Sequence, residues 1–183
     1  RYMVDNNIVG GNWLQVKRNT YNIRSESSKH SYCQIEMDVV YEDIISLDVN
    51  IPKWAGLAPL RIFSFDIECM GRRGFFPDPQ QDPVIQIAAY VQCQGASEPL
   101  AKIVLVLNSC LPIVGAEVVA FEDEADMLVA FSKLLKDADP DIVTGYNIQN
   151  FDFPYLVDRA KKLKIGETFA QLSKLKNKVC QCK

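Results

Sequence analysis

The sequence predicts an α/β fold with a mixed β-sheet, preceded by part of a β-rich domain. From residue 60 onward, runs of β-forming residues alternate with amphipathic helical stretches, which is the pattern of helices packed on a sheet. Before that point, short β segments with polar turns end in a Pro- and Gly-containing stretch at 52–59 that reads as a linker. We therefore expect residues 1–58 to form a β-rich segment with its linker, and residues 59–183 to form a separate α/β domain.

Strands and helices follow from local patterns. In the first part, strands are expected at 2–4, 13–16 and 32–40, the last because apolar and polar residues alternate there. In the second part, strands are expected at 60–68, 84–93, 101–107 and, as a short buried strand, at 141–145. A helix is expected at 122–137, where apolar residues recur with helical spacing. A second helix is expected from Phe153, with Asp152 as its N-cap.

Composition excludes several classes of protein. Uncharged stretches such as 103–116 are too short and too broken by Pro and Gly to span a membrane. The six cysteines are too sparse for a disulfide framework and lack zinc-site spacing, so we expect free thiols, with Cys180 and Cys182 unexplained. Residues 61–160 contain fifteen acidic and seven basic side chains. That balance is typical of carboxylates gathered around metal ions.

Two carboxylates lie on the first strand of the predicted α/β domain. Asp66 and Glu68 are two residues apart, so both point to one face, with Cα atoms about 6–7 Å apart. Phe63, Phe65 and Ile67 take the other face. Neighbouring carboxylates persist when a cation shares them or when they lie at a wet rim of the sheet, and both explanations stay open. With no His or Cys to complete the set, the cation would be Mg²⁺ or Mn²⁺.

A third acidic residue follows the strand expected at 141–145. Residues just past the carboxyl end of a strand are where α/β sheets present chemistry, and Asp152 in the string YNIQNFDFPYL can reach the first strand from there. Its role as an N-cap is compatible with this second role. Asn147 and Asn150 fit hydrogen bonds within the loop at least as well as contact with a substrate.

These strings resemble two motifs of one family. FDIE at 65–68 is similar to the first exonuclease motif of family B DNA polymerases, and YNIQNFD at 146–152 is similar to the second. The longer strings SFDIEC, DPVIQI and TGYNIQNFD, and the opening RYMVDNNIVGGNW, resemble the eukaryotic replicative members of that family. The resemblance covers nearly the whole chain and is clearest between residues 58 and 164.

The resemblance implies an RNase H-like (DnaQ-type) exonuclease domain that proofreads the 3′ ends of new DNA. Asp66 and Glu68 would bind two divalent ions, Mg²⁺ or Mn²⁺, and Asp152 would hold the second ion directly or through water. Phe151 would help to hold Asp152, although a place in the core is the commoner explanation for an aromatic residue. The implied partners are DNA, through the single-stranded 3′ end of the primer strand, a sliding clamp and polymerase accessory subunits. The implied location is the nucleus, with no membrane.

One motif of the family is absent from the sequence. The third exonuclease motif, Tyr-x-x-x-Asp, supplies the last metal ligand and a Tyr that orients the water, but no Tyr here is followed by Asp four residues later. The aspartates of the polymerase site are also absent. We therefore expect a fragment truncated at its C-terminus and nearly inactive by itself.

Two other classes compete with the nuclease. A non-catalytic scaffold or binding module of the same fold would have no need of Asp66, Glu68 and Asp152 together. An aspartyl-phosphate phosphotransferase would begin with Asp-x-Asp and use a downstream Lys, whereas Glu68 occupies the second position here. The motifs favour the nuclease over both alternatives, which the fold alone would not do.

Overall fold

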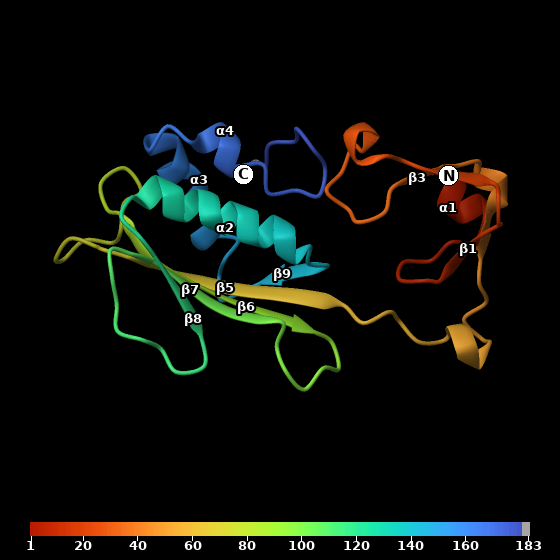
Figure 1. The fold of residues 1–183 in the computed structure, drawn as a ribbon, viewed down its shortest axis with the longest axis horizontal. Helices are drawn as coiled ribbons and strands as arrows, with labels where there is room; N and C mark the ends of the chain where they lie inside the picture. The colour runs from red at the N-terminus through yellow and green to blue at the C-terminus, as the bar shows by residue number, and fades with distance from the viewer. Residues whose placement is uncertain (181–183) are drawn as a thin grey trace. The chain divides into compact units, whose positions relative to one another are not determined.

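A computed structural model describes residues 1–180 of the chain. The chain divides into two compact units, residues 1–60 and 61–183, which run from red to orange and from yellow to blue in Figure 1. The boundary expected after residue 58 lies close to this division. The identity of the two units as part of a β-rich domain and as an exonuclease domain stays a prediction.

The first unit has short strands and no hydrophobic core. Its two antiparallel sheets pair β1 (Leu14–Val16) with β4 (Ile44–Ser46), and β2 (Tyr21–Ile23) with β3 (Met37–Val39). Four single turns complete it: α1 (Tyr2–Asp5) and the 3₁₀ turns η1 (Glu26–Ser28), η2 (Tyr41–Asp43) and η3 (Pro52–Trp54). None of its hydrophobic side chains is buried.

One expectation for this unit is wrong and another is confirmed only in part. Residues 2–4 belong to a helical turn rather than a strand, because the backbone N–H and the side-chain amide of Asn6 both donate to the Tyr2 carbonyl. The strand expected at 32–40 is reduced to β3. The Glu36 carboxylate accepts hydrogen bonds from the backbone N–H groups of His30 and Ser31 and from the Ser31 hydroxyl at 2.6 Å, and these bonds fold residues 30–36 into a loop.

The second unit is built on a mixed five-stranded sheet. Its strands are β5 (Arg61–Cys69), β6 (Val84–Cys93), β7 (Ala101–Leu107), β8 (Glu117–Phe121) and β9 (Ile142–Thr144). They lie in the order β8-β7-β6-β5-β9. The β5–β6 and β6–β7 pairs are antiparallel, whereas β8 runs parallel to β7 and β9 runs parallel to β5. The expected α/β fold with a mixed sheet is confirmed.

Helices cover one face of this sheet. α2 (Glu124–Ala138), α3 (Asp152–Lys162) and the short α4 (Gly166–Phe169) lie together on that side (Figure 1). Phe63 and Phe65 of β5 meet Phe131 of α2, with ring centroids 6.1 and 5.1 Å apart, at the centre of the core. Burial of each such side chain stabilises the fold by about 1.5–3 kcal/mol. No helix of residues 1–180 is long and apolar enough to cross a membrane.

Two details of the sheet differ from expectation. β8 was not expected at all. β9 forms as expected, but it is not a buried strand: Ile142 is 41% exposed, because β9 is an edge strand with β5 as its one neighbour.

Candidate functional site

The acidic pair lies on the uncovered face of β5. Phe63, Phe65 and Ile67 are at most 5% exposed and point toward the helices. Asp66 and Glu68 alternate with them and are exposed on the opposite face, as the spacing predicts. Asp66 also lines an open groove of about 340 Å³ on that face, together with residues of β6 and β7.

Asp152 lies beside the backbone of β5 at Ile67, the residue between Asp66 and Glu68. The pairing of β9 with β5 ends at Ser64 and Thr144, so the edge of β5 beyond Ser64 has no strand beside it. The Ile67 N–H there donates to Oδ1 of Asp152, at 3.2 Å. Asp152 is 1% exposed. One hydrogen bond therefore joins the two sequence motifs.

The expected role of Asp152 as an N-cap is wrong. Asp152 is the first residue of α3, and Phe151 is the cap residue, whose side chain makes no capping hydrogen bond. The chain before the helix takes over this function, because the Phe153 N–H donates to the Ile148 carbonyl at 2.9 Å. The carboxylate of Asp152 is thus available to β5.

Burial and neighbouring charge act on the carboxyl group of Asp152. Burial raises the pKa of the Asp152 carboxyl; hydrogen bonds from the N–H groups of Asp152 and Ile67 oppose this shift, and the charge of Asp66 adds to it. A cation near these carboxylates would offset both unfavourable effects. Burial raises the pKa of the neighbouring Cys69 thiol to about 11, so the thiol is protonated at neutral pH and is a poor metal ligand.

The three carboxylates are neighbours, but they do not converge on one point. Within residues 1–180, no group of three Asp, Glu, His or Cys side chains is arranged to hold a metal ion. Asp66 and Glu68 face solvent, whereas Asp152 faces the edge of β5. An all-carboxylate set suits a hard divalent cation such as Mg²⁺. Coordination by Asp66, Glu68 and Asp152 together stays a prediction.

The loop before α3 is fixed by its two asparagines. Asn147 adopts a left-handed backbone conformation (φ 54°), and its side-chain oxygen accepts a hydrogen bond from the Asn150 amide at 2.9 Å. The Asn147 carbonyl accepts from the N–H groups of Asn150 and Phe151. These bonds support the expected role of Asn147 and Asn150 in holding the loop, while their contact with a substrate stays a prediction. Phe151 is half-buried, and its ring centroid lies 5.4 Å from that of Phe76 and 5.5 Å from that of Tyr155.

Sequence reasoning missed Gly145. A Cβ atom at this position would collide with the Phe65 carbonyl and the Ile148 side chain, so a glycine is needed where the chain leaves β9 and passes β5. This close approach lies one residue before Asp66. The only signal in the sequence was a glycine directly after a β-forming run.

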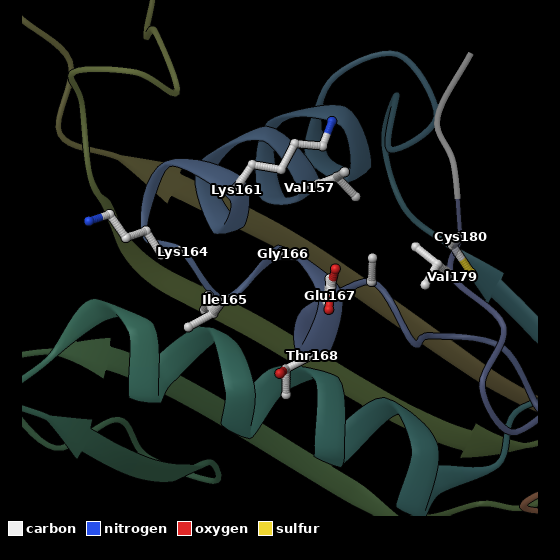
Figure 2. Close-up of a pocket in the computed structure, with 10 residues that line it drawn as sticks. Val157, Lys161, Lys164, Ile165, Gly166, Glu167, Thr168, Val179 and Cys180 are labelled. Carbon is white, nitrogen blue, oxygen red and sulfur yellow. The ribbon is translucent and has the colours of Figure 1, made fainter.

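The hollow drawn in Figure 2 is separate from the three carboxylates. It has a volume of about 740 Å³ and lies beside α3 and α4, where Lys161, Lys164 and Glu167 border it. It does not form part of the candidate site.

Carboxylates near the end of an inner strand and at the start of the adjoining helix supply the oxygen ligands that a metal-dependent nuclease needs. Comparison with protein families agrees with this class. The sequence model of the DNA polymerase family B exonuclease domain matches residues 1–183, and the chain belongs to this family.

Known relatives support the same conclusion. The chain is 48% identical over 177 residues to the DNA polymerase delta catalytic subunit of Oryza sativa, and 49% identical over 165 residues to that of Bos taurus. These matches cover 97% and 90% of this chain, but only 16% and 15% of the relatives. The resemblance read from the motifs is confirmed.

A solved structure is also similar. It is the family B DNA polymerase from the archaeon Pyrobaculum calidifontis, with a TM-score of 0.58 and 28% identity. The match covers 94% of this chain and 18% of the archaeal one.

Proposed function

We propose that the second unit is part of an RNase H-like 3′–5′ exonuclease domain of a replicative DNA polymerase, and that the first unit belongs to the β-rich domain before it. The observation that carries this proposal is the hydrogen bond from Ile67 to Asp152, which holds the second motif against the first. The proposed class of reaction, exonuclease cleavage of DNA, follows from membership of the family B exonuclease-domain family.

The proposed reaction is hydrolysis of the terminal phosphodiester of DNA. Bound Mg²⁺ or Mn²⁺ ions would supply an activated water and stabilise the developing charge. Asp66 and Glu68, on the open face of β5, would hold the ions where a DNA end has access, and Asp152 would complete the set from the edge. The water oxygen would bond to phosphorus as the bond to the 3′ oxygen breaks, the proton lost by the water would pass by way of solvent to that oxygen to give a 3′ hydroxyl, and a 5′-mononucleotide would leave. Without cations, these carboxylates would repel the phosphate.

The proposed substrate, partners and location apply to the whole polymerase. The substrate is the single-stranded 3′ end of a primer strand, and the partners are a sliding clamp and polymerase accessory subunits. The proposed location is the nucleus, where replication takes place in eukaryotes.

Substitution of Asp66 tests this function in the full-length polymerase. Asp66→Ala should abolish removal of mismatched primer ends and leave nucleotide addition intact. Asp137→Ala is a matched control, because Asp137 is an exposed acid on α2. Normal excision by Asp66→Ala would overturn the proposal.

A non-catalytic module of the same fold is the second candidate. It is favoured by the absence of three converging ligands within residues 1–180. A full-length polymerase with no excision in Mg²⁺ or Mn²⁺ before any substitution would support this alternative.

A further inference from the structure

Helix α3 is held to the rest of its unit by two buried side chains beyond Asp152. The Tyr155 hydroxyl donates to the Asp82 carbonyl at 2.7 Å. The Arg159 guanidinium donates to the Pro79 carbonyl at 3.1 Å. Both carbonyls belong to the loop 70–83, which leaves β5 just after Glu68 and leads into β6. The helix that begins with Asp152 is thus tied to the loop that follows Glu68.

Arg159 also forms a buried ion pair with α2. Its Nε and Nη2 atoms donate to the two carboxylate oxygens of Glu124, at 2.9 and 2.7 Å. Oε1 of Glu124 accepts a further hydrogen bond from the Val84 N–H at 2.7 Å. Both side chains are about nine-tenths buried. One carboxylate therefore joins the first turn of α2, the first residue of β6 and helix α3.

The spacing along α3 connects this pair with Asp152. Asp152, Tyr155 and Arg159 are separated by three and four residues, so they lie along one face of the helix. A bidentate arginine has a fixed planar geometry. Rotation of α3 about its axis would therefore break the pair with Glu124 and move Asp152 away from Ile67.

We propose that Arg159 and Glu124 are positioning residues of the exonuclease site, which set the rotation of α3 and so hold the Asp152 carboxylate against the Ile67 N–H. The expected effect of this pair on excision rests on the proposed function, whereas its expected effect on the position of Asp152 does not. The pair touches neither substrate nor reacting atoms and acts through Asp152.

Replacement of both partners separates positioning from stability. Removal of one partner leaves a buried charge unpaired, whereas loss of both charges is often neutral or stabilising. In Glu124→Gln/Arg159→Met, Gln retains an acceptor for Val84, and Met fills the space of Arg without donating to Glu124 or Pro79. We expect this double variant of the full-length polymerase to fold, to add nucleotides normally and to excise on the order of 10²-fold more slowly, because small misplacements have effects of this size.

Hydrogen exchange provides a readout that is independent of activity. Exchange of the Ile67 amide, measured by mass spectrometry without metal, should speed up in the double variant, while β6 and β7 keep their protection. Loss of protection throughout the sheet would instead indicate a purely structural role and would overturn the proposal. Arg159→Lys keeps the charge without the bidentate geometry and should give an intermediate excision rate.

Lys161→Ala is a matched control, because it breaks an exposed ion pair with Asp158 on the same helix. It should leave excision and Ile67 exchange unchanged. A double variant with normal excision and normal Ile67 exchange would refute the positioning role. Asp66→Ala, measured alongside, tests the proposed function separately. If the Asp66→Ala polymerase still excises, the proposed function fails. In that case, hydrogen exchange at Ile67 alone decides whether Arg159 and Glu124 position Asp152.

Discussion

At the residue scale, the Asp152 carboxylate connects the two acidic motifs through the amide of Ile67. The sequence alone predicted that Asp152 could reach the first strand, but it could not reveal the atom that Asp152 contacts. The N-cap expectation failed because the Ile148 carbonyl already serves the first turn of the helix. Such a backbone partner leaves no signal in residue types.

Substitutions of Asp152 separate its charge from its hydrogen bond. Asp152→Asn keeps an acceptor for Ile67 and removes a charge that is unfavourable when buried, so the free energy of unfolding should stay unchanged or rise, while excision collapses for lack of a charged ligand. Asp152→Ala leaves a buried N–H unpaired and should lower stability by about 1–3 kcal/mol. Denaturant unfolding and primer excision measure the two effects. Full excision by Asp152→Asn would contradict a ligand role.

Glu36 gives a pH-dependent prediction in the first unit. Hydrogen bonds, first from the Ser31 hydroxyl and then from the His30 backbone, lower the pKa of Glu36 from its ordinary value of 4.5 to about 2. Because the folded pKa is the lower one, the stabilisation is complete above pH 4.5 and is lost as the pH falls from 4.5 toward 2. NMR titration of the carboxyl carbon should show this low pKa. A midpoint near 4.5 would contradict the loop geometry.

At the element scale, the long buried strands and α2 were predictable because their apolar periodicity reflects burial. The three-residue strands were not predicted reliably, because such short segments contain too few residues to show a period. The apolar and polar residues of 32–36 alternate like a strand, yet the Glu36 carboxylate holds them in a loop. Local hydrogen bonding outweighed the pattern there.

Substitution of Gly145 tests whether the chain that leaves β9 must pass close to β5. In Gly145→Ala, the new methyl group would push the chain away from Phe65 and Ile148, and the overpacking should lower stability by about 1–3 kcal/mol. Displacement of the loop before Asp152 should also lower excision more than nucleotide addition. Gly10→Ala is a suitable control, because no atom outside its own chain neighbours lies within 4 Å of its new Cβ. Equal stability of the two variants would show that the close approach is not required.

At the scale of the whole molecule, the chain spans about 16% of the length of its DNA polymerase delta relatives. The motifs were sufficient to identify the family, because their residue types and spacing reflect the chemistry directly. The Glu124–Arg159 pair escaped sequence analysis, because its partners are 35 residues apart and charged residues are usually exposed.

We expect the 183-residue chain to excise poorly by itself. It contains no Tyr-x-x-x-Asp motif, and under the proposed function that motif would supply a metal ligand and a Tyr that orients the water. Loss of one stabilising group commonly lowers the rate by about 10²–10³-fold. A 3′-end assay on labelled single-stranded DNA, with the Asp66→Ala chain as control, measures this. Robust trimming that disappears in the Asp66→Ala chain would show that two motifs are sufficient.

We propose that Asp66, Glu68 and Asp152 form one divalent-metal site at the end of β5. Anomalous diffraction from crystals of the full-length polymerase, grown with Mn²⁺ and a single-stranded 3′ end, tests it most directly. We predict a Mn²⁺ peak bound by Asp66 and Glu68, with Asp152 bonded to an ion directly or through a water. Absence of a peak at the end of β5 in crystals that bind Mn²⁺ elsewhere, or a peak whose ligands exclude Asp66 and Glu68, would contradict the claim.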